Sequence, residues 1–206
     1  MHSMVRQALP NESIRKGRPL EAGLRDKLLD HTIKILLRDG YKQFSMSAVA
    51  QSASASKETL YRHFGDKAGL LHAALIRNAQ HIGPLLQQGL EQAGTREEKL
   101  QRLGMNYLRA CYLPEALALQ RIAYADGESG LGPLFAQEIT EHAIQHVIQV
   151  FQQLGSPAPR ADAETYLGMI QGKLHEKILL GVELDNLEEL LQEQVQHAVR
   201  VFMAYL

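Results

Sequence analysis

The chain has 206 residues, of which 45% are hydrophobic, and it contains a single cysteine. A hydrophobic share of this size favours a packed core over disorder, and one cysteine excludes an internal disulfide. No stretch reaches the roughly 18 consecutive apolar residues of a membrane span, and the first twenty residues lack the apolar centre of a secretory signal. We therefore expect a cytoplasmic protein with no membrane partner.

The net charge of −1 conceals an uneven distribution along the chain. Up to His72 there are 12 Lys and Arg against 7 Asp and Glu, a net charge of +5, whereas the remainder has 10 against 16, a net charge of −6. A basic front on an acidic body is typical of a nucleic-acid-binding unit carried by another domain. Charge alone also fits a chance asymmetry, so the choice depends on the motifs.

Residues 1–19 are polar, include two prolines and show no periodicity, so we interpret them as a flexible basic arm. From residue 20 onward, apolar residues recur at helical spacings, and neither alternating runs nor hairpin turns predict strands. Gly40 is expected to end the first helix, and Gly83-Pro84 to bend the fourth. The pattern predicts an all-α fold of about nine helices, at approximately 21–38, 46–52, 57–64, from 67 to beyond 79, 96–112, 115–125, 133–154, 162–180 and 187–205.

The most informative stretch is residues 45–64. Two short helices, each preceded by a serine suited to N-capping, are separated by only three residues, which is the spacing of a helix-turn-helix. Val49, Ala50 and Leu60 would form its small apolar core. The outward face of the second helix carries hydrogen-bond donors suited to phosphates and base edges, namely Lys57, Thr59, Tyr61, Arg62 and His63. A generic helix pair with a solvated polar face has the same spacing, so the pattern alone leaves both interpretations open.

Residues 17–72 carry a resemblance to a known family. Its most specific part is the block Thr59-Leu60-Tyr61-Arg62-His63-Phe64 followed by Lys67, joined by Gly17-Arg18-Pro19, Gly40-Tyr41, Phe44-Ser45, Val49-Ala50, Ser56 and Leu70-Leu71. On these residues the chain resembles the TetR/AcrR (tetracycline-repressor-like) family of transcriptional regulators. It departs from the family pattern at Ser54, where glycine is usual in a turn with positive φ, and at Ala55, which is usually a larger aliphatic residue.

The resemblance implies that the second helix of the motif lies in the major groove as a recognition helix. Lys57, Thr59 and Arg62 would then reach base edges or flanking phosphates, and Tyr61 and His63 would contact the DNA backbone. Phosphate contacts are also implied for Ser45 and Ser47 at the start of the preceding helix, and for Lys67. Arg18, in the arm, either reaches into a minor groove or belongs to an untethered tail.

The resemblance further implies a helix-turn-helix domain at residues 20–66 and an effector-binding and dimerisation domain at 67–206. The last two helices are amphipathic, and the family makes them a homodimer interface, although their apolar stripes also fit packing within one chain. The stripe residues are Leu167, Ile170, Leu174, Ile178, Leu191, Val195, Ala198 and Phe202. Gly168 and Gly172, four residues apart, would allow a close approach between helices.

A pocket for a small apolar effector among the central helices is also implied by the family. Candidates for its lining are the polar or soft residues on otherwise apolar helices, namely Tyr107, Cys111, Tyr124, His142 and His146. The two histidines share a helix face, and with Glu138 they either bind a divalent metal or are ordinary structural histidines. Cys111 either senses oxidants or is a buried structural thiol. We expect no metal and no cofactor.

These expectations combine into a homodimeric repressor that binds a near-palindromic operator in double-stranded DNA and is released by a small-molecule effector. Two other classes remain open, namely a helical DNA-organising protein without effector control and an enzyme that uses Cys111. The sequence has no Gly-rich phosphate loop, nucleophile elbow, zinc ligand set or paired carboxylates, so we expect no catalysis.

Overall fold

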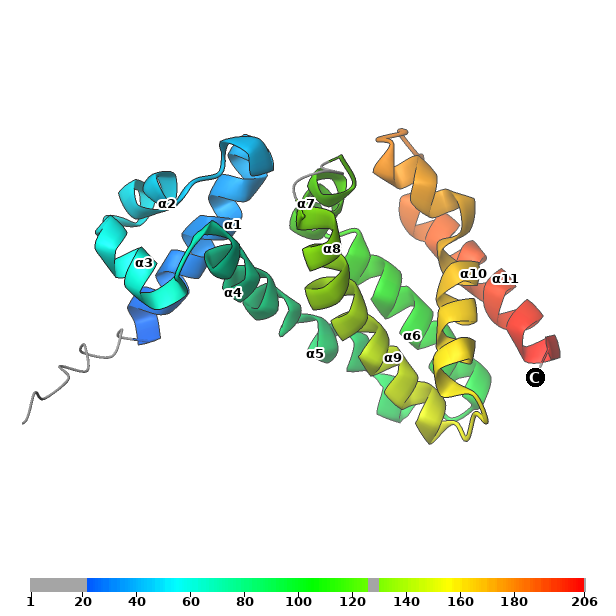
Figure 1. The fold of residues 1–206 in the computed structure, drawn as a ribbon. Helices are drawn as coiled ribbons and strands as arrows, with labels where there is room; N and C mark the ends of the chain where they lie inside the picture. The colour runs from blue at the N-terminus through cyan, green and yellow to red at the C-terminus, as the bar shows by residue number, and fades with distance from the viewer. Residues whose placement is uncertain (1–21, 126–129, 206) are drawn as a thin grey trace, which may run out of the picture.

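The computed structural model describes residues 22–125 and 130–205, and every element in these two stretches is a helix. The helices divide in space into a head and a body (Figure 1). The head consists of α1 (Ala22–Gln43), α2 (Met46–Ala53), α3 (Lys57–Phe64) and α4 (Lys67–Ala79). The predicted all-α class is therefore confirmed, with the helix-turn-helix near the N-terminus. The predicted arm at 1–19 lies outside the described residues.

The body begins where α4 ends, and its last two helices lie side by side at the end of the molecule farthest from α2 and α3 (Figure 1). Its elements are α5 (Ile82–Gln87), η1 (Leu90–Gln92), α6 (Arg96–Cys111), α7 (Pro114–Ala125), α8 (Leu131–Phe135), η2 (Ala136–Thr140), α9 (Glu141–Gln153), α10 (Pro159–Leu179) and α11 (Leu187–Tyr205). Among the described residues, no helix is both long and apolar enough to cross a membrane.

A first hydrophobic cluster lies within the body, between α5, α6, α9, α10 and α11. At its centre, the rings of Phe151, Tyr166 and Phe202 pack in tilted and edge-to-face pairs, with centroids 5.6 to 5.8 Å apart. Such ring pairs contribute beyond the area that they bury, so they fix the mutual placement of α9, α10 and α11.

A second cluster fills the head and continues into the body. Leu28 and Leu60 belong to it, and so do Leu119 and Ala123 of α7 and Leu131 at the start of α8. The apolar face of α4 packs against α1 in the same cluster, so a domain boundary at residue 66 would divide it. The core beneath α2 and α3 thus includes side chains from the body.

Glycines interrupt two long helices. Gly40, at φ 72° and ψ 171°, ends the regular part of α1 as the sequence predicts. Gly172, at φ 46° and ψ −154°, breaks α10, and the side-chain amide of Gln194 donates to the carbonyl of Met169 at 2.7 Å beside the break. Gly168 makes no close helix approach within one protomer, because a Cβ there would meet no described atom within 4 Å, so the close approach expected there stays a prediction.

The path from head to body turns at residues 80–81, earlier than the predicted bend. α4 ends at Ala79, and Pro84 lies in the first turn of α5, where its missing N–H costs no helical hydrogen bond. Gly83 lies against the ring of His146, leaving no room for a side chain. Farther along, η2 is one turn of the wider π-helix between α8 and α9, a feature that often marks functional sites.

Candidate nucleic-acid interface and ligand pocket

The turn between α2 and α3 has left-handed geometry. Ser54 has φ 56° and ψ 41°, and the N–H of Ala55 donates to the carbonyl of Ala50 at 2.9 Å. The departure from glycine at position 54 therefore leaves a serine in a strained conformation, in keeping with the positive φ that the motif requires. Ala50 and Leu60 are buried beneath the turn, which holds the two helices at a fixed angle.

Serine caps fix the start of each helix. The hydroxyl of Ser45 accepts a hydrogen bond from the N–H of Ala48 at 3.2 Å, and that of Ser56 accepts from the N–H of Thr59 at 3.0 Å. The hydroxyls of Ser56 and Thr59 also lie 2.8 Å apart. Ser45 and Thr59, both predicted DNA contacts, are thus already part of local hydrogen bonds, whereas Ser47 is exposed on α2.

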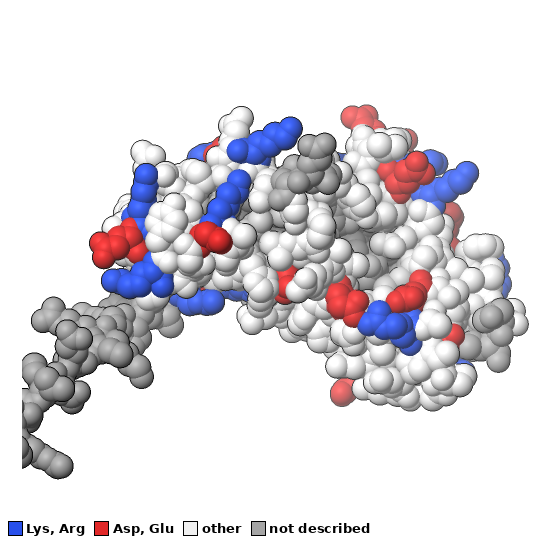
Figure 2. All heavy atoms as spheres, viewed as in Figure 1, with Lys and Arg blue, Asp and Glu red and all other residues white. Residues whose placement is uncertain are grey.

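The outward face of α3 is polar and accessible. Lys57, Glu58 and Arg62 are exposed, and Tyr61 is 53% exposed although it is a large aromatic residue. On the face of the molecule seen in Figure 2, Lys and Arg side chains stand out over the head. The exposed ring of Tyr61, with the cations Lys57 and Arg62 on the same helix, suits a surface that binds a nucleic-acid backbone.

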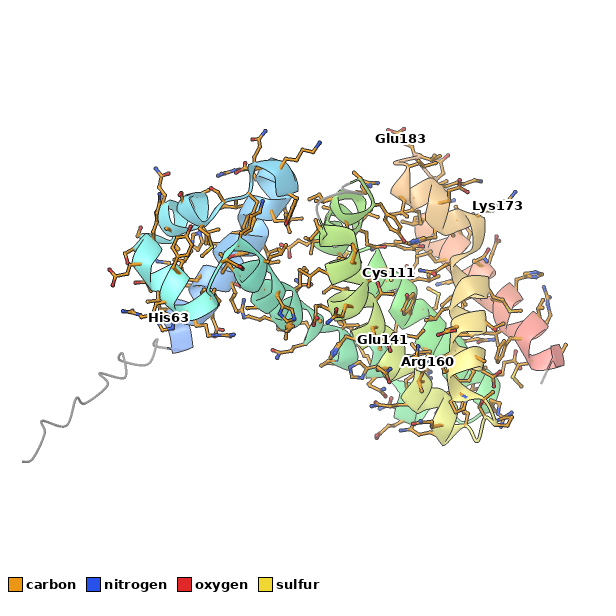
Figure 3. The ribbon with its side chains drawn as sticks, in the orientation of Figure 1. His63, Cys111, Glu141, Arg160, Lys173 and Glu183 are labelled. Atoms are coloured by element: carbon orange, nitrogen blue, oxygen red, sulfur yellow. The ribbon has the colours of Figure 1, made fainter. Side chains whose placement is uncertain are left out.

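His63 differs from these exposed residues, because it is half-buried near the start of α1 (Figure 3). Its Nε2 atom is enclosed and makes no hydrogen bond within the described part of the chain. An enclosed polar nitrogen without a partner is costly, and an external group would reach this atom only after the surrounding side chains move. The predicted phosphate contact at His63 stays a prediction.

Lys67 links the start of α4 to the end of α1. Its ammonium group donates to the carbonyl of Tyr41 at 3.0 Å and lies 4.0 Å from the centre of the Tyr41 ring and 5.4 Å from that of Phe44. The geometry therefore gives Lys67 an internal structural role beside the predicted phosphate contact. Arg18 lies outside the described residues.

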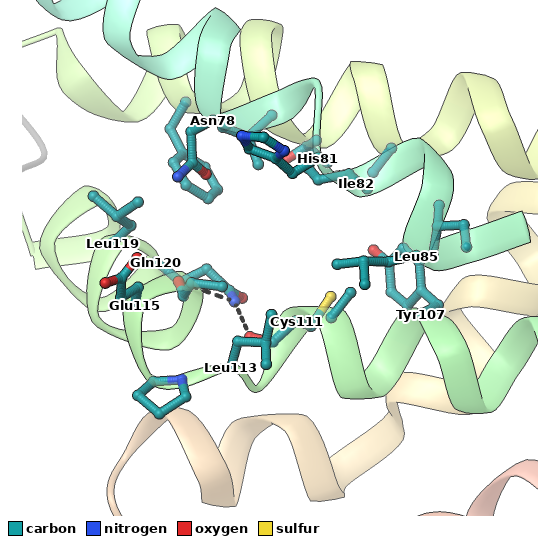
Figure 4. A pocket seen from close by; sticks show the side chains of 18 of the residues that line it. Asn78, His81, Ile82, Leu85, Tyr107, Cys111, Leu113, Glu115, Leu119 and Gln120 are labelled. Atoms are coloured by element: carbon teal, nitrogen blue, oxygen red, sulfur yellow. Dashed lines mark hydrogen bonds between the residues drawn. The ribbon is translucent and has the colours of Figure 1, made fainter. Parts of the chain in front are cut away.

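A cavity of about 720 Å³ opens between α4, α5, α6, α7, η2 and α10 (Figure 4). This volume is in the range of sites for drug-sized molecules. Its lining is largely apolar and includes Ile82, Leu85, Leu86, Ala110, Leu113, Leu119, Phe135, Ile139 and Ala143. No Lys or Arg occurs among the described lining residues, and Glu115 is exposed.

The polar lining groups are held by hydrogen bonds to their neighbours. Nδ1 of His175 lies 3.0 Å from the hydroxyl of Tyr112, which is outside the lining. The side-chain amide of Gln120 donates to the carbonyls of Cys111, at 2.7 Å, and Ala116, at 3.4 Å (Figure 4).

Burial changes the acid–base character of this lining. It raises the pKa of the Cys111 thiol to about 12, and it lowers the pKa of the His175 imidazole. Both groups are therefore neutral near neutral pH. Cys111 lies inside the body (Figure 3) as a protonated thiol, which favours the structural interpretation of this residue over oxidant sensing.

Of the five predicted lining residues, three lie at the cavity, namely Tyr107, Cys111 and Tyr124. His142 and His146 do not line it, and their Nε2 atoms lie 3.4 Å from each other. Glu138, the expected third metal ligand, instead pairs with His72 of α4 at 3.0 Å. Within the described residues, no group of three or more metal-ligating side chains is close enough to hold a metal ion.

Sequence reasoning missed several polar lining residues, namely Asn78, His81, Gln120, Gln171 and His175. Gln120 carried a usable signal, because it interrupts the apolar stretch of its helix and is only 8% exposed. Gln171 and His175 flank the break at Gly172, and nothing in the helical spacing indicates that break.

The predicted dimer residues require a correction. Leu174 is partly buried against the body cluster, and the other seven belong to that cluster as buried residues: Leu167, Ile170, Ile178, Leu191, Val195, Ala198 and Phe202. The apolar stripes of α10 and α11 face each other and α6, so they pack within one protomer. A dimer interface on these helices stays a prediction, and it would have to use their opposite faces.

Two family models match this chain. The family described as bacterial regulatory proteins, tetR family, matches residues 28–74. The family described as AefR-like transcriptional repressor, C-terminal domain, matches residues 98–205, which is more than half of the chain. The first match covers the helix-turn-helix and the start of α4, and the second covers the body from α6 onward.

Individual relatives agree with these matches. The chain is 26% identical, over 162 residues, to a DNA-binding transcriptional repressor TetR of Mycobacteroides abscessus, covering 77% of this chain and 84% of that protein. A solved TetR-family transcriptional regulator from Mesorhizobium loti MAFF303099 superposes with a TM-score of 0.77 at 22% identity, over 89% of this chain and 96% of that one. The flavonoid-responsive regulator FrrA gives 0.73 at 23% identity, over 90% and 97%. At these identities the two structures share the fold.

Proposed function

The chain belongs to the TetR family of bacterial regulatory proteins and is a DNA-binding transcriptional regulator, and from that premise we propose a homodimeric repressor whose α3 reads the major groove. A small and largely apolar ligand in the 720 Å³ cavity would release it from its operator. The comparisons point to a family of regulators rather than of enzymes.

The observation that carries the DNA-reading role is the division of α3 into two faces. Leu60 is fully buried, while Lys57, Tyr61 and Arg62 point donors away from the core. We assign Lys57, Thr59 and Arg62 to base edges and flanking phosphates, and Tyr61 and His63 to the DNA backbone.

Release by a ligand is supported by the position of the cavity. Asn78 of α4 and Leu119 of α7 both line it, and Leu119 also belongs to the hydrophobic cluster of the head. A ligand that fits one placement of α4 better than another would shift the population between DNA-binding and non-binding states. Ligand and operator would then weaken each other's binding by the same factor.

Homodimerisation is assigned to the outward faces of α10 and α11. Thr165 and Gly168 of α10 are exposed, as are His197 and Val201 of α11, the latter with 43% of its surface accessible. A two-fold contact through these faces would leave each head at the end of its own body that is farthest from the contact (Figure 1). Two heads related by symmetry would read a near-palindromic operator.

Selection from a random duplex library by the full chain, at near-physiological salt, tests the DNA-reading role, because affinity depends strongly on salt. We expect one near-palindromic site to be enriched. Thr59→Ala and Arg62→Ala should change the preferred sequence, whereas Tyr61→Ala and Lys67→Ala should weaken binding to every sequence. Enrichment of no site would contradict the proposal and favour a DNA-organising protein, and uniform losses across all four variants would contradict the division of roles.

A further inference from the structure

The polar groups of the cavity differ in whether their hydrogen-bonding sense is fixed. The hydroxyl of Tyr107 rotates and can both donate and accept, and the tautomer of His175 is open. Gln120 is different, because its NH₂ group faces two carbonyl oxygens, those of Cys111 at 2.7 Å and Ala116 at 3.4 Å. A flipped amide would place its own oxygen against both carbonyls, so this orientation is the only one compatible with the neighbours.

The oxygen of that amide is left for a ligand. No described residue donates to Oε1 of Gln120, and the residue is 8% exposed. The only fully enclosed and unpaired side-chain atom among the described residues is Nε2 of His63, so Oε1 of Gln120 is accessible, and the space beside it is the cavity (Figure 4). The cavity therefore offers a fixed acceptor, and only a hydrogen-bond donor satisfies an acceptor.

The charges around the cavity point in the same direction. An anion would face the oxygen of Gln120 without a permanently charged partner, because the described lining holds no Lys or Arg and its basic side chains are the imidazoles of His81 and His175. Arg121, next in sequence, donates instead to the carbonyls of Ile178 and Leu179. Burying a carboxylate without a partner is strongly unfavourable.

We propose that the effector is an uncharged, largely apolar molecule whose polar end is a hydrogen-bond donor, and that Gln120 is the residue that selects it. This inference rests on the proposed effector role of the cavity. It excludes carboxylates of the same size, and it makes Gln120 a specificity-determining residue rather than a structural tie alone.

Three matched probes test the selection by isothermal titration calorimetry on the full chain without DNA, namely para-hexylphenol, para-hexylanisole and para-hexylbenzoate. At about pH 7.5 the phenol is neutral and donates, the anisole is neutral and cannot donate, and the benzoate is ionised. We expect the phenol to bind about tenfold more tightly than the anisole, and at least about a hundredfold more tightly than the benzoate. Equal or tighter binding of the benzoate, equal binding of the phenol and the anisole, or binding of none overturns the proposal.

Gln120→Leu replaces the carboxamide with an apolar side chain of similar volume and thereby removes the acceptor. The preference for phenol over anisole should fall from about tenfold to about equal, while Gln152→Leu, an exposed change on α9, should leave it unchanged. An unchanged preference in Gln120→Leu contradicts the role of this residue. Should Gln120→Leu fail to fold, the three-probe comparison on the unaltered chain still decides the ligand class.

A separate titration of the phenol into the operator complex distinguishes this inference from the proposed function. Preferential binding of the phenol without release of DNA supports the ligand class and contradicts the effector role. Release of DNA by the benzoate but not by the phenol contradicts the ligand class and leaves the effector role standing.

Discussion

The head and the body carry their binding features in opposite ways. In the head, two capped helices of eight residues each hold a small apolar core and turn polar side chains outward, so the whole feature comes from neighbouring residues. In the body, long helices enclose a cavity whose lining runs from Asn78 of α4 to His175 of α10. The surface of the head therefore depends on local structure, and the cavity depends on how distant helices are placed. This difference predicts which substitutions damage one region and spare the other.

The largest expected effect comes from Leu60→Ala in the head. Leu60 is the fully buried residue of α3, and removing such a side chain costs about 2–5 kcal/mol. We expect operator binding to be lost and the amides of α2 and α3 to exchange faster in hydrogen-exchange mass spectrometry, while those of α9, α10 and α11 keep their protection. Equal loss of protection in the body would show that the chain unfolds as one unit.

The matching substitution in the body is Gly104→Ala. Its Cβ would lie 2.3 Å from the hydroxyl oxygen of Tyr166 and 2.9 Å from Cγ1 of Val195, so it overpacks the core. Overpacking of this kind costs about 1–3 kcal/mol, whereas alanine gains roughly 1 kcal/mol over glycine in a helix. We therefore expect a net decrease in the free energy of unfolding. Urea denaturation measures this change. Tyr166→Phe in the same chain should recover part of it, and a stabilised Gly104→Ala would contradict the close packing.

A smaller effect is expected from the caps of the head. Ser56→Ala removes the acceptor for the N–H of Thr59 and frees the Thr59 hydroxyl, at a cost of about 1 kcal/mol. We expect faster exchange at the start of α3 and severalfold weaker operator binding by fluorescence anisotropy. Ser54→Gly is the matched control with the opposite sign, because it relieves the positive φ at the turn. Losses of equal size in both variants would contradict this account.

The smallest effect is a pH dependence confined to the body. Burial lowers the pKa of His175, and burial together with nearby His142 lowers the pKa of His146. As pH falls below about 6.5, the unfolded chain takes up these protons first, so stability is constant above that value and declines below it. Thermal unfolding between about pH 7.5 and 5.5 measures the decline. It should flatten in a His146→Gln, His175→Gln variant, and an unchanged slope would contradict the assignment.

The same difference between the regions explains what could be predicted from the sequence. The helix-turn-helix follows from capping serines, a three-residue turn and alternating apolar and polar faces, all of which are local. The body was predictable as a set of helices, because their apolar spacing is also local. The unusual conformation of Ser54 was foreseen for the same reason, since the motif itself requires a positive φ there.

What could not be predicted depends on long-range placement. The apolar stripes of α10 and α11 have the spacing of either a dimer face or an internal core, and only the position of α6 decides that they pack internally. The break at Gly172 and the π turn at η2 bring Gln171, His175 and Ile139 to the cavity, and neither has a sequence signal as strong as a cap. His142 and His146 share a helix face as predicted, but neither of them lines the cavity.

Leu119 belongs both to the cavity lining and to the hydrophobic cluster of the head, and this has a consequence for how ligand preference can change among related regulators. Leu119 lines the cavity and also packs in the cluster beneath the helix-turn-helix, whereas its neighbour Gln120 lines the cavity and belongs to neither hydrophobic cluster. A related protein that adapts to a new ligand by changing Leu119 would also lose affinity for its operator. Selection for the new ligand would then oppose selection for operator binding. Changes at Gln120 escape that conflict, and related chains with new ligand preferences should therefore have diverged at position 120 while keeping a large aliphatic residue at 119.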